Sequence, residues 1–175
     1  ANLNVDVVNN SISGLKGHGS GTRTNNSWGV IIWAGNNARV IYNSINVSDN
    51  RSSTTSVAFD GGILINNSGS TGIDVINNMI SVTSVPGNTD GKSFAIFSAA
   101  TNPFGTIRNN NYHVASGSQF FVGHNGTDRV SLSDWTTAVT ADVNSISVDP
   151  LFAGATNLVP SAGAANDLAF VIPSI

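Results

Sequence analysis

The chain has 175 residues, a net charge of −3, a pI near 5.3 and no Cys. This length suits one domain, the acidic balance argues against a nucleic-acid partner, and the lack of Cys excludes a disulfide framework and Cys-based metal sites. All 10 acidic residues are Asp, and Val and Ile supply 33 residues against 7 Leu. That composition favours β-branched strands joined by turns rich in Asn, Gly, Ser and Thr, and it argues against helical bundles and doubly wound α/β folds.

A repeat organises the chain from its first strand onward. The segment at 7–12 reads Val-Val-Asn-Asn-Ser-Ile, and related segments lie at 40–45, 75–80 and 106–111. Each places an Asn shortly after two β-forming residues. The resulting series has spacings of 33, 35 and 31 and consists of Asn10, Asn43, Asn78 and Asn109. Apolar runs at 29–32, 62–65, 94–97 and 119–122 lie between these segments, so each repeat predicts two short strands separated by polar loops.

Repeats of this length indicate a solenoid, in which each unit buries its apolar face on its neighbours. Helical spacing of apolar residues is missing, and Leu is too scarce for leucine-rich repeats. We therefore predict an all-β parallel β-helix of about four coils. One domain covers 1–175, with repeats near 5–37, 38–72, 73–104 and 105–130 and a closing section at 131–175. The repeated Asn is expected to accept left-handed backbone at a corner and to hydrogen-bond along the axis.

These Asn-bearing repeats resemble those of right-handed parallel β-helix proteins with pectate-lyase-like architecture. The later part of the chain is also similar to the closing section of β-helix domains in large bacterial surface and secreted proteins. In such domains a short helix around a Trp precedes an Asp-Pro-x-Phe turn. The matching residues here are Asn109-Asn110-Asn111-Tyr112-His113, Ser131-Leu132-Ser133-Asp134-Trp135 and Asp149-Pro150-Leu151-Phe152. The resemblance implies a right-handed parallel β-helix with a short helix around 133–139 and an extracellular or cell-surface setting. It implies no particular activity, because one fold hosts many functions.

Paired carboxylates would be needed for glycoside hydrolysis, roughly 5–9.5 Å apart. Asp60 and Asp90 lie about one coil apart and form the best such pair, although turn positions beside glycines explain both more simply. Lys16 and Lys92 are isolated, and no cluster of carboxylates suits Ca²⁺. We therefore expect no enzyme, catalytic residue, cofactor or metal site. A polysaccharide lyase or glycoside hydrolase is the alternative.

Histidine and aromatic residues supply two further candidates. His113, His124 and Asp128 could form a metal or acid–base site, but their spacing matches no ligand motif, and rim positions are favoured. Trp28 and Trp33 bracket a strand at odd spacing, which places them on opposite faces, one buried and one exposed. Exposed aromatic rings, with Phe120 and Phe121 among the candidates, would let a carbohydrate-binding module stack on sugars.

Asn-x-Ser/Thr triplets mark six candidate glycosylation positions, which matter only in a host and compartment that have the glycosylation enzymes. They are Asn9, Asn25, Asn46, Asn50, Asn66 and Asn125.

The two ends of the solenoid are the candidate surfaces for self-association, because an uncapped coil exposes unpaired strand edges. Head-to-tail pairing of the ends would give a filament, and the alternative is that further coils of a longer β-helix supply the caps. The residues concerned are Leu3, Val5, Val7, Leu168, Phe170 and Ile172. We predict a non-catalytic extracellular structural or adhesive module that associates head to tail. Cell-surface or environmental polysaccharide is a further candidate partner, and no apolar run is long enough to span a membrane.

Overall fold

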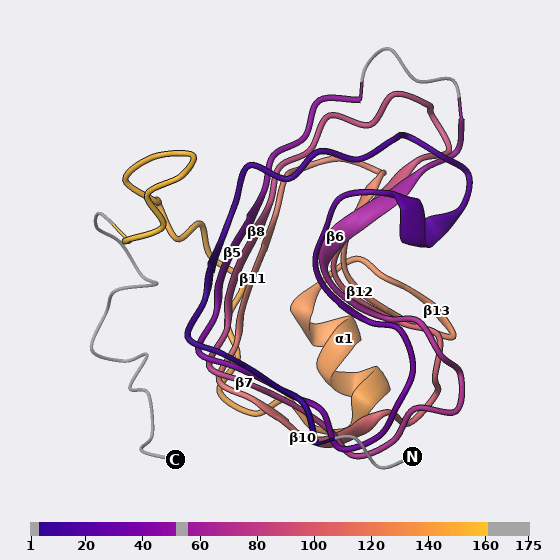
Figure 1. Ribbon diagram of the computed structural model, residues 1–175, viewed down its shortest axis with the longest axis vertical. Helices are drawn as coiled ribbons and strands as arrows, with labels where there is room; N and C mark the ends of the chain where they lie inside the picture. The colour runs from indigo at the N-terminus through magenta and orange to yellow at the C-terminus, as the bar shows by residue number, and fades with distance from the viewer. Residues whose placement is uncertain (1–3, 52–55, 161–175) are drawn as a thin grey trace.

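The computed structural model describes residues 4–51 and 56–160, which fold as a parallel β-solenoid (Figure 1). Three sheets run along the solenoid axis, and each turn of the chain adds one strand to every sheet. The chain makes about three turns, slightly fewer than the four coils predicted, and each sheet holds four parallel strands. The all-β class and the short helix near the C-terminal end are confirmed.

Each repeat contributes one strand to each sheet. The first sheet contains β1 (Asp6–Val8), β4 (Arg39–Ile41), β7 (Ile73–Ile76) and β10 (Phe104–Arg108). The second contains β2 (Ser11–Ile12), β5 (Ser44–Val47), β8 (Met79–Val82) and β11 (Asn111–Val114). The third contains β3 (Trp28–Ile32), β6 (Phe59–Ile65), β9 (Lys92–Ser98), β12 (Phe120–Asn125) and the antiparallel β13 (Thr127–Arg129). A 3-10 turn, η1 (Arg23–Asn25), precedes β3.

Two adjacent residues in each repeat make the corner between the first and second sheets. The first of the two has left-handed backbone, with φ of 57° at Asn9, 58° at Tyr42 and 57° at both Asn77 and Asn109. The second is an Asn that bonds along the axis. The repeat pattern predicted that one Asn would do both tasks, with Asn109 in that series. The structure divides the tasks, so Asn109 forms the bend and Asn110 takes the axial position. This bend also explains why each repeat has three strands where two were predicted.

Inward side chains of the three sheets form one continuous apolar core. Equivalent residues stack in register from coil to coil, as Ile12, Ile45 and Ile80 do in the second sheet. The core is built largely of β-branched residues that are fully buried, among them Val40, Ile45, Ile63, Ile73, Val75 and Ile80. Such side chains pack well on pleated strands, which is why this sequence uses Val and Ile rather than Leu.

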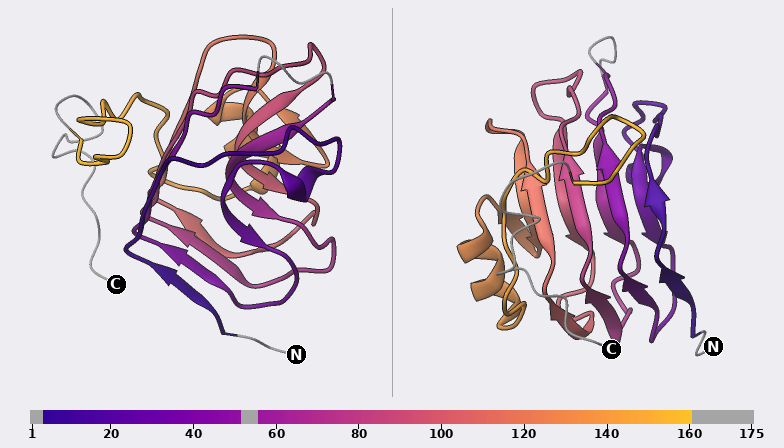
Figure 2. Two further views of the ribbon diagram at one scale, coloured as in Figure 1. Left: turned by 45° about the horizontal axis from the view of Figure 1, so that its top comes forward. Right: turned by 90° about the vertical axis from the view of Figure 1, so that its left-hand side faces the viewer.

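Helix α1 (Leu132–Val139) covers the C-terminal end of this core (Figures 1 and 2). The Oγ of Ser131 accepts the backbone N–H of Asp134, whose carboxylate accepts the backbone N–H of Ser131 in return. Trp135 is fully buried against the last coil. Gly123 makes room for it, because a Cβ at that position would overlap the indole.

The chain after α1 runs back along the outside of the second sheet toward the first coil, as the right-hand view of Figure 2 shows. Phe152 pairs antiparallel with Pro160, so this part of the chain ends in a small hairpin. Asn46 donates from Nδ2 to the carbonyl of Ala155 at 3.1 Å, and Leu158 is buried. Within residues 4–51 and 56–160, no helix has the length and apolar character needed to span a bilayer.

Candidate functional site

A ladder of Asn side chains runs along the corner between the first and second sheets. Nδ2 of Asn10 donates to Oδ1 of Asn43 at 2.9 Å, Asn43 donates likewise to Asn78 at 3.0 Å, and Asn78 to Asn110 at 3.0 Å. The same Oδ1 atoms accept the backbone N–H of the preceding Asn at 3.0 to 3.1 Å. Every link points the same way, so the ladder ends in an acceptor at one end of the solenoid and in donors at the other.

The donor end of the ladder is closed by residues that follow α1. The backbone N–H of Asn110 donates to Oγ of Ser145 at 2.8 Å, and its Nδ2 lies 3.5 Å from Oδ1 of Asp142. Nε1 of Trp135 donates to Oδ2 of Asp142 at 2.7 Å. Burial raises the pKa of Asp142, although hydrogen bonds from Ser145 and other neighbours act in the opposite direction. At this end of the solenoid, Trp135 therefore covers the apolar core, and the donors of Asn110 have acceptors.

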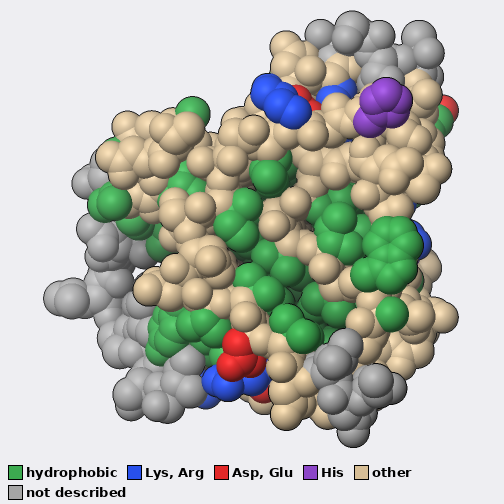
Figure 3. Space-filling view, in the orientation of Figure 1, with side chains coloured by type: hydrophobic (Ala, Val, Ile, Leu, Met, Phe, Trp, Pro, Cys, Tyr) green, Lys and Arg blue, Asp and Glu red, His purple; other side chains and the backbone are tan. Residues whose placement is uncertain are grey.

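The acceptor end of the ladder is open. In the part of the chain that the structure describes, no group donates to Oδ1 of Asn10, which is exposed. Beside it, Val5 is 48% exposed and Trp33 63% exposed, and both line a hollow of about 130 Å³ with Val7 and Val30. Figure 3 looks onto this end and shows apolar side chains gathered at its centre. We call the surface formed by Val5, Val7, Asn10, Val30, Ile32 and Trp33 the N-terminal end face.

A second apolar cluster lies outside the main core, on the other face of the third sheet. It contains Trp28, Leu64, Phe94, Phe97 and Phe121, all at most 9% exposed. Phe94 and Phe121 stack with ring centroids 5.3 Å apart. These rings are too buried to offer a flat platform to sugars, because stacking on a ligand requires an exposed face.

Partly exposed polar groups edge this cluster. His124 stacks on Phe97 with centroids 4.2 Å apart, and the Arg23 guanidinium lies 4.4 Å from the centroid of Phe97. Nδ1 of His124 lies 2.6 Å from Oδ1 of Asp128, and Nζ of Lys92 donates to Oδ2 of the same carboxylate at 2.5 Å. Partial burial acts to raise the pKa of Asp128, but the hydrogen bonds from Lys92 and His124 outweigh it and lower the pKa.

The structure brings together only part of the predicted histidine site. His124 and Asp128 are joined, but His113 lies in β11 of the second sheet, with Nδ1 3.0 Å from Oγ of Ser81. Lys92, which looked isolated in the sequence, completes the group with His124 and Asp128. Coil stacking places Lys92 opposite Phe59 and lets it reach Asp128, 36 positions later. Residue spacing alone does not reveal this contact.

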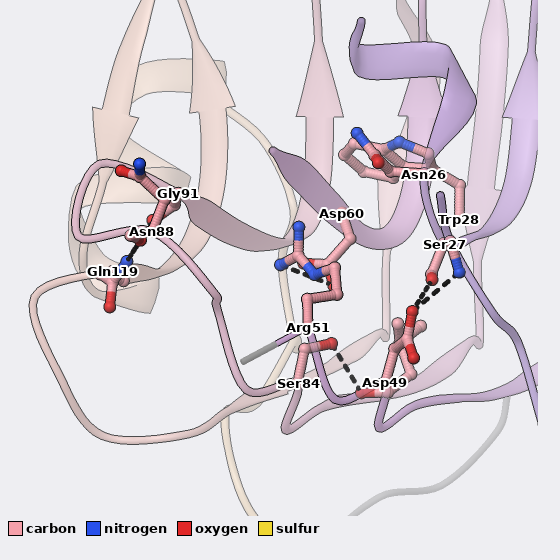
Figure 4. Close-up of polar contacts among 12 residues, drawn as sticks. Asn26, Ser27, Trp28, Asp49, Arg51, Asp60, Ser84, Asn88, Gly91 and Gln119 are labelled. Carbon is pink, nitrogen blue, oxygen red and sulfur yellow. Dashed lines mark hydrogen bonds and ion pairs between the residues drawn. The ribbon is translucent and has the colours of Figure 1, made fainter. Parts of the chain in front are cut away.

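A buried polar network fills the corner between the second and third sheets (Figure 4). Oδ2 of Asp49 accepts from Oγ of Ser27 at 2.7 Å and from the backbone N–H of Gly17 at 2.8 Å. Burial acts to raise the pKa of Asp49, but these hydrogen bonds outweigh it and lower the pKa. Nη2 of Arg51 lies 3.0 Å from Oδ2 of Asp60, with side-chain exposures of 2% and 0%. Burial raises the pKa of Asp60, while the Arg51 charge acts to lower it.

The alternative carboxylate pair is not formed. Asp60 is fully buried against Arg51, whereas Asp90 is exposed in the turn before β9. Two carboxylates in such different environments do not face one exposed bond. Among the described residues, no group of three His, Cys, Asp or Glu side chains is placed to hold a metal ion.

The remaining candidates are dispersed. Trp28 is buried and Trp33 is exposed, as expected, but Trp28 packs in the outer cluster rather than in the main core. Of the glycosylation candidates, Asn46 is buried under the hairpin, Asn66 and Asn125 are half-buried, and Asn9, Asn25 and Asn50 are exposed. Leu3, Leu168, Phe170 and Ile172 lie outside the described residues.

Comparison of the chain with protein-family models, curated proteins and solved structures found no match.

Proposed function

We propose that this chain is a non-catalytic structural or adhesive module of an extracellular or cell-surface protein, and that it associates through its N-terminal end face. The difference between its two ends carries this proposal. One end is closed by Trp135 and Asp142, while the other exposes Val5 and an unused acceptor on Asn10. An exposed apolar patch beside unpaired strand edges favours association. The extracellular setting rests on the resemblance of the closing section alone.

Association through one end differs from the head-to-tail filament that the sequence suggested. Direct strand pairing at the C-terminal end would require α1 to leave the last coil, where Trp135 is fully buried. Open filaments need two complementary surfaces on each subunit. Among the described residues one such surface is open, so discrete complexes are the expected product of association through it.

The group formed by His124, Asp128 and Lys92 supports a second candidate, an enzyme or binding module for polysaccharides. Asp128 is positioned to orient His124, an arrangement used in general acid–base catalysis. The aromatic rings beside it are buried, however, and Asp60 is committed to Arg51. The geometry therefore favours the structural module over this alternative.

Two measurements test the proposal. Electron microscopy of concentrated protein should show discrete particles, and long ordered filaments would contradict association through one end. Incubation with uronic-acid and neutral polysaccharides should leave their chain lengths unchanged. Cleavage by the wild-type protein that His124→Asn abolishes would establish an enzyme instead. Lys16→Gln, which changes an exposed charge far from His124 in the sequence, is the matched control.

A further inference from the structure

We propose that Arg23 forms a binding site for an oxyanion, namely a carboxylate, sulfate or phosphate group, on the outer face of the third sheet. The site consists of Arg23 on η1, Phe97 on β9 and Asn66, which directly follows β6. This inference goes beyond the proposed function and does not depend on it, because the site uses none of the residues of the N-terminal end face.

Arg23 lacks the acidic partner that most cations of this chain have. Four of the seven Lys and Arg side chains form ion pairs with Asp at 2.5 to 3.4 Å, namely those of Lys16, Arg39, Arg51 and Lys92. Within 4–51 and 56–160, no carboxylate forms an ion pair with Arg23. Burial lowers the pKa of Arg23, since partial removal from water disfavours the charged form. A half-buried guanidinium without a counter-ion favours the binding of an anion.

The backbone of Arg23 is held by side chains of its own loop. Nε1 of Trp28 donates to the carbonyl of Arg23 at 2.9 Å, and Trp28 is 5% exposed. Nδ2 of the buried Asn26 donates to the carbonyls of Ser20 and Thr22 at 2.8 and 3.3 Å, and its Oδ1 accepts the backbone N–H of Ser20 at 2.9 Å. These contacts close the loop around η1, so Arg23 is positioned before a ligand binds.

Phe97 orients the guanidinium. The Cζ of Arg23 lies 4.4 Å from the ring centroid, a distance typical of a cation–π contact. The ring is itself fixed, because Phe97 is 3% exposed and His124 stacks on it with centroids 4.2 Å apart. An Arg side chain held flat in this way presents its N–H groups as a rigid fork, which matches the spacing of oxygen atoms in a carboxylate, sulfate or phosphate.

Donors on Arg23 and Asn66 remain available to such a ligand. Nη2 of Arg23 makes one long contact, 3.4 Å to Oδ1 of Asn66. Nη1, which is not buried, makes no hydrogen bond in the part of the chain that the structure describes. Nδ2 of the half-buried Asn66 also makes none to the residues of 4–51 and 56–160. An oxyanion beside Nη1 and Nη2 would thus meet two charged donors and a neighbouring amide.

The surrounding charges favour an anion over a cation. Lys92 and His124 edge the same aromatic cluster, and both contact one carboxylate, that of Asp128. Arg23, Lys92 and Asp128 together carry one more positive than negative charge, although the whole chain has a net charge of −3. Arg23 already occupies a position over Phe97, where a cationic ligand would otherwise stack. An oxyanion would balance the excess positive charge.

The expected ligand is external to the chain. Asp167 is the one acidic side chain outside the described residues, since 1–3 and 52–55 contain none. Asp167 is therefore the internal competitor that an experiment must address.

The binding of simple anions to the full chain tests the site. NMR spectra of isotope-labelled protein follow the Nε–H groups of Arg and the side-chain amides of Asn during titration with sodium acetate, sulfate or phosphate, at an ionic strength held constant with sodium chloride. Saturable shifts centred on Arg23 and Asn66 are expected. Tighter binding of acetate would support a carboxylate ligand, and tighter binding of sulfate or phosphate would support a ligand with such a group. Responses that equal that of chloride and do not saturate would overturn the site.

Arg23→Gln should weaken anion binding about ten-fold or more, the loss expected when a charged hydrogen-bonding group is removed. Arg108→Gln is the matched control, because it removes the same charge from another half-buried Arg that has no ion pair or cation–π contact among the described residues. It should weaken binding less than about two-fold, since distant charges are largely screened by salt. Equal weakening in the two variants would overturn a site at Arg23.

The Tm of Arg23→Gln without added anion separates binding from a purely structural role. Because Arg23 has no counter-ion to lose, its Tm should lie within about 2 °C of the wild-type value. If Arg23→Gln is less stable than this, Arg23→Lys supplies the test, because Lys keeps the charge but not the planar fork. Undiminished anion binding by Arg23→Lys would overturn the proposed recognition.

Asp167→Asn tests the internal competitor. Saturable binding of equal strength in the wild-type protein and in this variant is expected. Binding that appears only when Asp167 is replaced would show that this carboxylate occupies Arg23, and it would overturn an external ligand.

Discussion

Nε1 of Trp135 donates a hydrogen bond to Oδ2 of Asp142 at 2.7 Å, and the exposed fractions of the two residues are 0% and 2%. This contact links the cap of the apolar core to the cap of the Asn ladder. The indole covers the last layer of the apolar core, and the carboxylate lies at the donor end of the Asn ladder. Natural solenoids need such caps because an open coil exposes both apolar surface and unpaired polar groups.

Trp135→Ala should lower the free energy of unfolding by about 3–5 kcal/mol, the usual cost of truncating a buried aromatic side chain. Urea denaturation followed by circular dichroism measures this loss. Trp33→Ala is the matched control, because Trp33 is 63% exposed and surface changes usually stay within about 0.5 kcal/mol. Similar losses for the two variants would show that α1 does not cap the core.

Asn78→Ala should cost about 2–4 kcal/mol of unfolding free energy, since each buried polar group left without a partner costs about 1–3 kcal/mol. The change removes the acceptor of Asn43 and the donor to Asn110 and to the carbonyl of Val40. Asn10→Ala should cost only about 0.5–1.5 kcal/mol, because Asn10 is exposed and bonded on one side. Urea midpoints of the two variants check the difference, and equal losses would contradict a ladder with one open end.

Asp60→Asn should destabilise the protein by about 3–5 kcal/mol, because it leaves the Arg51 charge buried without its counter-ion. The double variant Arg51→Met with Asp60→Leu should recover most of this loss. Nε and Nη1 of Arg51 have no hydrogen-bond partner in the described structure. The contacts of the ion pair therefore offset only part of the free energy lost when its two charges leave water. Thermal unfolding of the single and double variants measures the recovery. A double variant no more stable than Asp60→Asn would show that the pair is required for packing.

Asp128→Asn should cost more stability at pH 6 than at pH 3. The pKa of Asp128 is lowered from its ordinary value of 3.8, so the folded state favours the ionised carboxylate more than the unfolded chain does. Its stabilising effect is therefore complete above the unfolded pKa and is lost as the pH falls through the folded pKa. Urea midpoints of the variant and the wild-type protein at the two pH values measure the difference, and a loss that does not change with pH would contradict the assignment.

Asp142→Asn should change stability with pH in the direction opposite to Asp128→Asn. Burial raises the pKa of Asp142 above 3.8, so the folded state favours the protonated form. The wild-type protein then loses stability through this group as the pH rises from about 4 through the folded pKa. Relative to the wild-type protein, the Asn variant should improve as the pH rises over that window. If the Asp128 and Asp142 variants respond to pH in the same direction, one of the two assignments is wrong.

Periodic features of the chain were sufficient to predict the architecture. The recurrence of β-forming residues followed by Asn identified a parallel solenoid, because stacking equivalent inward and corner positions in register favours similar side chains there at each turn. The helix around Trp135 was predicted from its resemblance to a closing section. The corner position was misplaced in one repeat, because Asn109 and Asn110 are identical in type and only the backbone shows that one is left-handed and the other bonds along the axis.

Features that depend on which coils lie side by side could not be predicted. Lys92 reaches Asp128, Arg51 reaches Asp60, and the C-terminal hairpin covers Asn46, although no local motif signals these contacts. The sequence by itself determined the repeat, the strand-rich fold and the presence of buried Asn, because these follow from residue type and period. Only the tertiary structure decided how the donor end of the ladder is closed, since that depends on where α1, Asp142 and Ser145 pack against the last coil rather than on the repeat.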